Sequence, residues 1–367
     1  MIDYDVLKVV WWALIGVLLI GFALTDGFDM GAGMLLPFIA RTDIERRVVV
    51  NSVGATWEGN QVWLVTAGAA IFAAWPMVYA TAFSGFYIAL LLVLFSLFFR
   101  PVGFDYRSKV QDQRWRSTWD WALFVGSAVP ALVFGVAFGN LLEGVPFQFD
   151  ADMRLAYGGS FWALLNPFAL LCGLVSVAML VMHGAAFLRL KASGVIVARA
   201  AYVNVGAGIA TFALFVIAGA LIVTVVPGYQ LSGNGSVTTA KGLWVSNYGF
   251  DVWFSLAPAL GLTGALASAL CAHRNHPVGA FAASSVSVAG VILTAGVSMF
   301  PFVVPSSTVP LQSLTMWNAT SSRLTLQIML VAVAVCLPIV LLYTAWAYRV
   351  MFGRVTAESV EQDHASY

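Results

Sequence analysis

Charged side chains are scarce in this chain. Only 10% of its 367 residues are charged, with 18 Lys and Arg against 17 Asp and Glu, whereas ordinary soluble domains carry roughly 25%. Because 60% of the residues are hydrophobic, the folded chain cannot cover its surface with charge in water. This excludes a soluble enzyme, a nucleic-acid-binding protein with a basic face and a disordered polar tail. A porin-type barrel is excluded too, because the apolar runs do not alternate with polar residues.

Cysteine is also rare. Cys172, Cys271 and Cys336 lie inside apolar runs without CxxC spacing, which predicts packing residues rather than a disulfide framework. The first residues, MIDYDVLK, lack the basic region of a signal peptide, so we expect the first apolar run to be retained as a membrane helix. Walker, Rossmann and zinc motifs are absent, which excludes ATP-driven transport by this chain.

The apolar runs predict an all-α polytopic membrane protein with nine spans. An α-helix rises 1.5 Å per residue, so about 20 apolar residues cross a hydrocarbon core of roughly 30 Å. The runs are 9–37, 49–73, 77–99, 119–142, 160–188, 201–226, 252–272, 278–301 and 325–350. The run 49–73 opens with polar residues, so eight and nine spans both have to be considered.

The positions of Lys and Arg favour nine spans. Basic residues in short loops stay on the cytoplasmic side of a membrane, and nine spans place most of them on one side. Omitting the second span would put the basic loops 41–47 and 100–116 on opposite sides. We therefore predict a single transmembrane domain over 1–367, with the N-terminus outside, the C-terminus in the cytoplasm and no soluble domain. The longest outer loops are 143–159, 227–251 and 301–324.

Three acids lie inside the predicted spans. Asp26 and Asp29 share one face of the first span, and Glu58 lies at similar depth in the second, on the order of 14 Å from its cytoplasmic end. A carboxylate in a bilayer costs about 2.5–3.5 kcal/mol on insertion scales, so these acids indicate either a proton path or structural hydrogen bonds. No Lys or Arg lies deep in any run, so we expect no internal ion pair. Asn60 and Gln61 would hold water in such a path or link helices.

The segment FRPVGFDYRSK, residues 99–109, concentrates charge at the cytoplasmic end of the third span. One interpretation is an ordinary positive-inside anchor. The other is that Asp105 opens a proton entrance, while Arg100 and Arg107 contact a partner or anionic lipid.

Histidine is scarce, and His183 is the one that lies within a predicted span. We predict that it forms hydrogen bonds or packs, rather than binding a metal. A six-coordinate b-type haem held by two histidines needs a second buried histidine. We therefore expect this chain to hold neither metal nor haem by itself.

Several motifs are long and specific. They are TDGFDMGAGML (25–35), WEGNQVWLVTAG (57–68), FFRPVGFDYRSK (98–109), LLNPFALLCGL (164–174), MFPFVVPSS (299–307), LTMWNATSS (314–322) and LLYTAWAYRVMFGR (341–354). Together they run nearly end to end and resemble subunit II of the cytochrome bd-type quinol oxidases.

The resemblance implies a complex in the bacterial cytoplasmic membrane that oxidises quinol, reduces dioxygen to water and builds a proton gradient without pumping. Subunit I would carry two b-type haems, one d-type haem and the quinol-oxidising loop. Subunit II would have two four-helix bundles plus a peripheral helix, bind no haem and stabilise subunit I. A small single-span accessory subunit, lipid and quinone are further expected partners, and nucleic acid is not.

The resemblance also implies a cytoplasmic proton path through Asp26, Asp29 and Glu58, with Asp105 at its entrance. This chain has Glu58 where the family pattern leads us to expect Asp, which keeps a carboxyl on a longer arm. It has Thr56 where His is often expected, which removes a titratable group, and His183 matches no family residue. The alternatives are a purely structural subunit and a stand-alone proton-coupled transporter, although the inverted repeats typical of transporters are not found.

Overall fold

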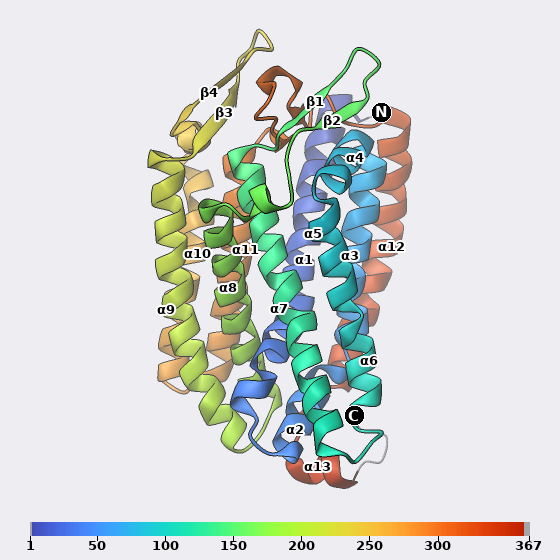
Figure 1. Ribbon diagram of the computed structural model, residues 1–367, viewed down its shortest axis with the longest axis vertical. Coiled ribbons are helices and arrows are strands. Elements are labelled where there is room, and N and C mark those ends of the chain that lie inside the picture. The colour runs from blue at the N-terminus through green and yellow to red at the C-terminus, as the bar shows by residue number, and fades with distance from the viewer. Residues whose placement is uncertain (1, 363–367) are drawn as a thin grey trace.

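The computed structural model describes residues 2–362 and confirms an all-α membrane architecture. Figure 1 shows an elongated bundle whose long helices run along its longest axis. The helices are α1 (Tyr4–Ile39), α2 (Asp43–Gly54), α3 (Trp57–Ala74), α4 (Pro76–Gly85), α5 (Tyr87–Leu97), α6 (Phe99–Tyr106), α7 (Gln113–Glu143), α8 (Pro167–Lys191), α9 (Val195–Thr224), α10 (Leu256–His273), α11 (Pro277–Met299), α12 (Arg323–Val350) and α13 (Ala357–Gln362). The domain limits 1 and 367 lie outside the described residues, so the single domain over 1–367 stays a prediction.

Eight helical segments within residues 2–362 are long and apolar enough to cross a membrane. They are Tyr4–Ile39, Tyr87–Tyr106, Gln113–Glu143, Pro167–Lys191, Val195–Thr224, Val252–His273, Pro277–Met299 and Arg323–Val350. These segments account for every predicted span except the second. The chain is therefore a multi-pass membrane protein.

The predicted second span is not one helix. Helix α2 ends at Gly54, and α3 begins at Trp57 after a tight turn in which the Thr56 N–H donates to the Val53 carbonyl at 3.0 Å. Glycine is a weak helix former, and the polar residues at the start of α3 lower its apolar character. The run 77–99 is interrupted as well, because α4, α5 and α6 meet at Phe86 and Phe98.

The predicted outer loops contain three two-stranded antiparallel sheets. They pair β1 (Phe147–Phe149) with β2 (Leu155–Tyr157), β3 (Pro227–Leu231) with β4 (Val237–Lys241), and β5 (Phe302–Val304) with β6 (Leu314–Thr315). Side chains from these segments, such as Phe147 and Trp244, are fully buried against the helix ends. The loops therefore share the core of the bundle. We call this the hairpin end.

The opposite end of the molecule carries α2, α13 and the C-terminal part of the chain, while the start of α1 lies at the hairpin end (Figure 1). Its connections are 40–42, 107–112, 192–194 and 274–276. Because many of the Lys and Arg residues lie in or beside these connections, we call it the basic end.

Glycines at four-residue spacing, Gly27/Gly31 in α1 and Gly135/Gly139 in α7, let the central helices approach closely. A Cβ on Gly31 of α1 would lie 2.7 Å from the Gly184 Cα of α8 and closer still to the Leu180 carbonyl oxygen. A Cβ on Gly135 of α7 would lie 2.7 Å from the Gly173 Cα. Helix α8 therefore contacts α1 and α7 backbone to backbone.

Replacing Gly31 with Ala should destabilise the protein, because the new methyl group meets backbone that cannot move aside. We expect a loss of about 1–3 kcal/mol, as for other overpacked sites. The matched control is Gly16→Ala in the same helix, where a Cβ meets nothing within 4 Å. Thermal unfolding of the purified protein in detergent compares the two, and equal midpoints would contradict the close contact.

Candidate functional site

Two buried side chains form an ion pair inside the bundle. Arg100 donates from Nη2 to Asp26 Oδ1 at 2.6 Å and from Nη1 to Asp26 Oδ2 at 2.8 Å. The Arg100 side chain is 1% exposed and that of Asp26 is 0% exposed. The expectation of no internal ion pair was therefore wrong, and so was the expectation that Arg100 contacts a partner or lipid.

The position of Arg100 in α6 explains why its side chain reaches into the bundle. It is the second residue of α6, just after the break at Phe98, and its long stem carries the guanidinium away from its own backbone. Gly126 of α7 leaves room for the stem, since a Cβ there would lie 3.3 Å from Arg100 Cγ. Trp57 covers the guanidinium, with the ring centroid 5.7 Å from Cζ, a cation–π contact.

Asp29 lies one turn after Asp26 in α1 and has a different partner. Its Oδ2 accepts a hydrogen bond from Asn60 Nδ2 at 2.7 Å, and Tyr348 donates its hydroxyl proton to Asn60 Oδ1 at 2.6 Å. The other oxygen, Oδ1, is buried without a hydrogen-bond partner. Asn60 thus links α1, α3 and α12, as one interpretation of the sequence proposed, and Asp29 forms no salt bridge within residues 2–362.

Glu58 lies at the predicted level of α3 but faces outward. The bond between Asn60 and Asp29 aligns α3 with α1, yet Glu58 is exposed while Asn60 is buried. Residues two positions apart point to different sides of a helix. The expected burial of Glu58 within the chain was therefore wrong, because α3 turns its other face to α1. Gln61 is half-buried.

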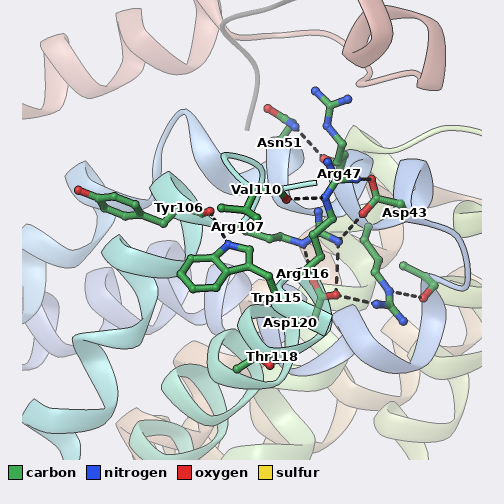
Figure 2. A network of polar contacts seen from close by, with 12 residues as sticks. Asp43, Arg47, Asn51, Tyr106, Arg107, Val110, Trp115, Arg116, Thr118 and Asp120 are labelled. Carbon is green, nitrogen blue, oxygen red and sulfur yellow. Dashed lines mark hydrogen bonds and ion pairs between the residues drawn. The ribbon is translucent and has the colours of Figure 1, made fainter. Parts of the chain in front are cut away.

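A second ionic network joins α2, α6 and α7 at the basic end (Figure 2). Arg107 donates to Asp120 from Nε at 2.6 Å and from Nη2 at 3.3 Å, and to Asp43 from Nη2 at 2.9 Å. Arg46 binds Asp120 at 2.7 Å, and Arg116 binds Asp43 at 2.6 Å. The Arg107 side chain is 1% exposed, so the expected contact of Arg107 with a partner or lipid was also wrong.

Sequence reasoning missed Asp120, although this acid falls inside the apolar run 119–142. Its signal was the basic cluster just before that run. Asp105, by contrast, is exposed on α6, and no described hydrogen bond or salt bridge joins it to Asp26 or Asp29. Thr56 lies at the turn before α3, where its hydroxyl donates to the Val53 carbonyl at 3.4 Å.

The hydrogen-bonding interpretation of His183 is confirmed. Its Nδ1 is hydrogen bonded to Ser284 Oγ at 2.8 Å and its Nε2 to the Leu24 carbonyl at 3.0 Å. The ring stacks on Phe281 at 4.9 Å between centroids. With both nitrogens engaged, His183 does not fit an axial haem ligand, which needs a free ring nitrogen. In the described part of the chain, no group of three His, Cys, Asp or Glu side chains could hold a metal ion.

Glu45 belongs to a third contact at the basic end. Burial alone raises the pKa of its carboxyl, but hydrogen bonds and the positive charge of Arg199 together outweigh burial and lower the pKa. The Arg41 backbone N–H and Arg199 Nη1 each donate to Glu45 Oε2 at 2.7 Å. Glu45 is thus held as a carboxylate between α1 and α9.

The chain is similar to known proteins over nearly its whole length. The family described as cytochrome bd terminal oxidase subunit II matches residues 7–351. The chain is 52% identical to cytochrome bd-I ubiquinol oxidase subunit 2 of Escherichia coli K12, with 100% of both chains covered. It is 34% identical to cytochrome bd ubiquinol oxidase subunit 2 of Bacillus subtilis, covering 94% of this chain and 96% of the relative. A chain of the Geobacillus thermodenitrificans bd oxidase shares the fold, with a TM-score of 0.66 at 15% identity and coverage of 94% and 98%.

Arg100→Gln should be strongly destabilising, because it leaves the Asp26 carboxylate buried without its cation. Breaking a buried pair by removing one partner typically costs about 3–5 kcal/mol. Adding Asp26→Asn should recover much of that loss, since the double variant buries no charge at the pair. Unfolding in mixed micelles measures the free energies, with the exposed Arg114→Gln as control. Equal losses for Arg100→Gln and Arg114→Gln would contradict the pair.

The contribution of Glu45 to stability should depend on pH. Its pKa is lowered in the folded state, so its stabilisation is present above the unfolded pKa of about 4.3 and is lost as the pH falls through the folded pKa. We expect wild type to be more stable than Glu45→Gln at pH 7 and the difference to close below about pH 4. Thermal unfolding between pH 7 and pH 4 measures the difference in stability, with the exposed Glu361→Gln as control. A difference that does not change with pH would be inconsistent with a lowered pKa of Glu45.

Proposed function

Because the chain belongs to the family of cytochrome bd terminal oxidase subunit II, we propose that it is the haem-free second core subunit of a bacterial quinol oxidase. In this proposal the complex oxidises quinol and reduces dioxygen to water. This chain stabilises the haem-bearing subunit I and supplies a cytoplasmic route for protons. The proposal rests on two carboxyls at the same level of the bundle. Asp29 is buried and has no salt bridge, and Glu58 faces outward.

The proposal includes nine spans, with α3 as the second. Helix α3 lies beside α1 and α12 (Figure 1). Helices α8, α9, α10 and α11 pack on one another, α1 packs on α3 and α7 and joins the two groups through α8, and α12 contacts α1 and α3 at the edge. This supports two four-helix bundles plus a peripheral helix. The basic end would face the cytoplasm, with the hairpin end outside.

Asp26 and Asp29 take different parts in the proposed proton route. Both oxygens of Asp26 are bound by Arg100, so protonating Asp26 would break the ion pair. Asp29 is held by a neutral amide, so it exchanges a proton without breaking one. We therefore propose that Asp26 neutralises the buried charge of Arg100 and that Asp29 carries protons. Asp105 would be the entrance of the route at the basic end.

Glu58 marks the surface that a partner covers. It lies on α3 among exposed apolar side chains such as Val62 and Val65, next to α12, whose most apolar stretch is 0% buried. Apolar helices can face lipid, but a carboxyl at membrane depth is expensive there. We infer that subunit I covers this face and that Glu58 passes protons across the interface. A small accessory subunit and lipid would occupy other parts of the surface.

Water formation explains why such a route is needed. Reducing dioxygen to water consumes protons as well as electrons. If quinol releases its protons outside and the new protons come from the cytoplasm, charge is separated without a pump. The haems, two b-type and one d-type and all placed in subunit I by this proposal, supply electron transfer and oxygen chemistry when bound.

A purely structural subunit is the second candidate, because the Arg100–Asp26 pair and the Asp43–Arg107–Asp120 network favour a stabilising role by themselves. The two candidates differ in what Glu58 does. Glu58 makes no described salt bridge within this chain, so changing it should leave the fold of the chain intact.

Glu58→Gln should lower oxygen consumption at saturating quinol by at least about tenfold, since a positioned proton-transfer group contributes roughly 10²–10⁴ in rate. Glu58→Asp should keep most of the activity, because it retains a carboxyl. Oxygen uptake by the assembled complex measures both variants, after its haem spectrum has shown that subunit I is present.

The matched control is Asp152→Asn, which removes an exposed carboxyl at the hairpin end. It should leave oxygen uptake unchanged. Unchanged uptake in an assembled Glu58→Gln complex would remove Glu58 from the route and leave the structural role as the better account.

A further inference from the structure

Arg189, in the last turn of α8, is a buried cation without a carboxylate. Its side chain is 1% exposed, and Nη2 donates to Asn275 Oδ1 at 3.2 Å. Its Nε and Nη1 are buried without hydrogen-bond acceptors. The other fully buried arginines, Arg100 and Arg107, are both paired with carboxylates. Leaving a buried charge unpaired is costly. We therefore expect Arg189 to bind an anion that the described part of the chain does not supply.

Basic side chains lie next to Asn275, the partner of Arg189. Exposed His273 ends α10, and exposed Arg274 and His276 lie in the connection 274–276. Helix α11 begins at Pro277, directly after this connection, and the N-terminus of a 23-residue helix carries a partial positive charge that favours anions. No salt bridge of the described residues joins Arg189 to a carboxylate.

We propose that Arg189, together with the segment 273–276 and the N-terminus of α11, forms a binding site for a phosphate group. The site takes inorganic phosphate or the phosphodiester of a lipid head group, whose oxygens match the planar donors of a guanidinium.

The same molecule shows how such an anion would be held. Arg107 grips the Asp120 carboxylate side-on, with Nε at 2.6 Å and Nη2 at 3.3 Å. In Arg189 the corresponding Nε is free, and Nη2 has only the neutral Asn275 amide at 3.2 Å. Asn275 is exposed, so its side chain can turn outward and leave its place to a phosphate oxygen. Nη1 remains available for a second oxygen or for water.

Two sources supply this chemistry at the basic end. Basic pockets between membrane helices on the cytoplasmic side bind the head groups of anionic lipids, and free phosphate reaches the same end from water. The two sources share the phosphate group and differ in whether an acyl chain is needed.

Titration of the delipidated, assembled complex distinguishes them. The probes are inorganic phosphate and phosphatidylglycerol in mixed micelles, with phosphatidylcholine as the lipid of no net charge, and the readout is the thermal unfolding midpoint. A ligand that binds only the folded state raises this midpoint. Arg189→Gln should lower the affinity for the probe that binds by roughly 10- to 100-fold, because a charge-assisted hydrogen bond is lost. Arg114→Gln, an exposed arginine at the same end, should bind as wild type does.

Each outcome decides the matter. A shift with inorganic phosphate supports a free-phosphate site, and a shift with phosphatidylglycerol but neither phosphate nor phosphatidylcholine supports a lipid head-group site. If neither anionic probe raises the unfolding midpoint of the wild type, the proposal is overturned and the site holds water. An equal rise of the midpoint in Arg189→Gln overturns it as well. If Arg189→Gln does not assemble, Arg189→Lys takes its place: it keeps the charge but loses the side-on grip, so its affinity should fall, and wild-type affinity would overturn the proposal.

Discussion

The rest of the site depends on the ion pair between Arg100 and Asp26. Inside a membrane protein neither charge has bulk water to stabilise it, so the two must meet in one geometry, with both carboxylate oxygens on one guanidinium. This requirement brings the start of α6 against the middle of α1. Trp57 then closes over the cation from α3. The helices that carry the candidate route are thereby held around one buried charge pair.

The pair also separates the roles of the two acids in α1. With Arg100 committed to Asp26, Asp29 is left with the amide of Asn60, which in turn binds Tyr348 of the peripheral helix α12. Helix α3 presents Asn60 inward and Glu58 outward. In the proposed oxidase subunit, one helix therefore connects an internal carboxyl with the face that meets subunit I.

Much of the fold and part of the site were predictable from the sequence, because hydropathy locates the spans and the hairpin between the first two spans relates the depths of their residues. The similar depth of Asp29 and Glu58 follows from these patterns, and the hydrogen bonding of His183 was predicted as well. The inward direction of Arg100 was not predictable, because it depends on how α6 packs against α7 and on the space beside Gly126. The outward face of Glu58 was missed for a related reason: spacing says which residues share a face, but not which face meets a neighbouring helix.

The central claim is that Asp29 exchanges protons during turnover while the Arg100–Asp26 pair stays charged. Redox-induced infrared difference spectra of the assembled oxidase test it directly, because the C=O stretch of a protonated carboxylic acid is separate from the bands of carboxylates. We expect a protonated-carboxyl signal in wild type that disappears in Asp29→Asn and persists in Asp152→Asn. A signal that is unchanged in Asp29→Asn would contradict it.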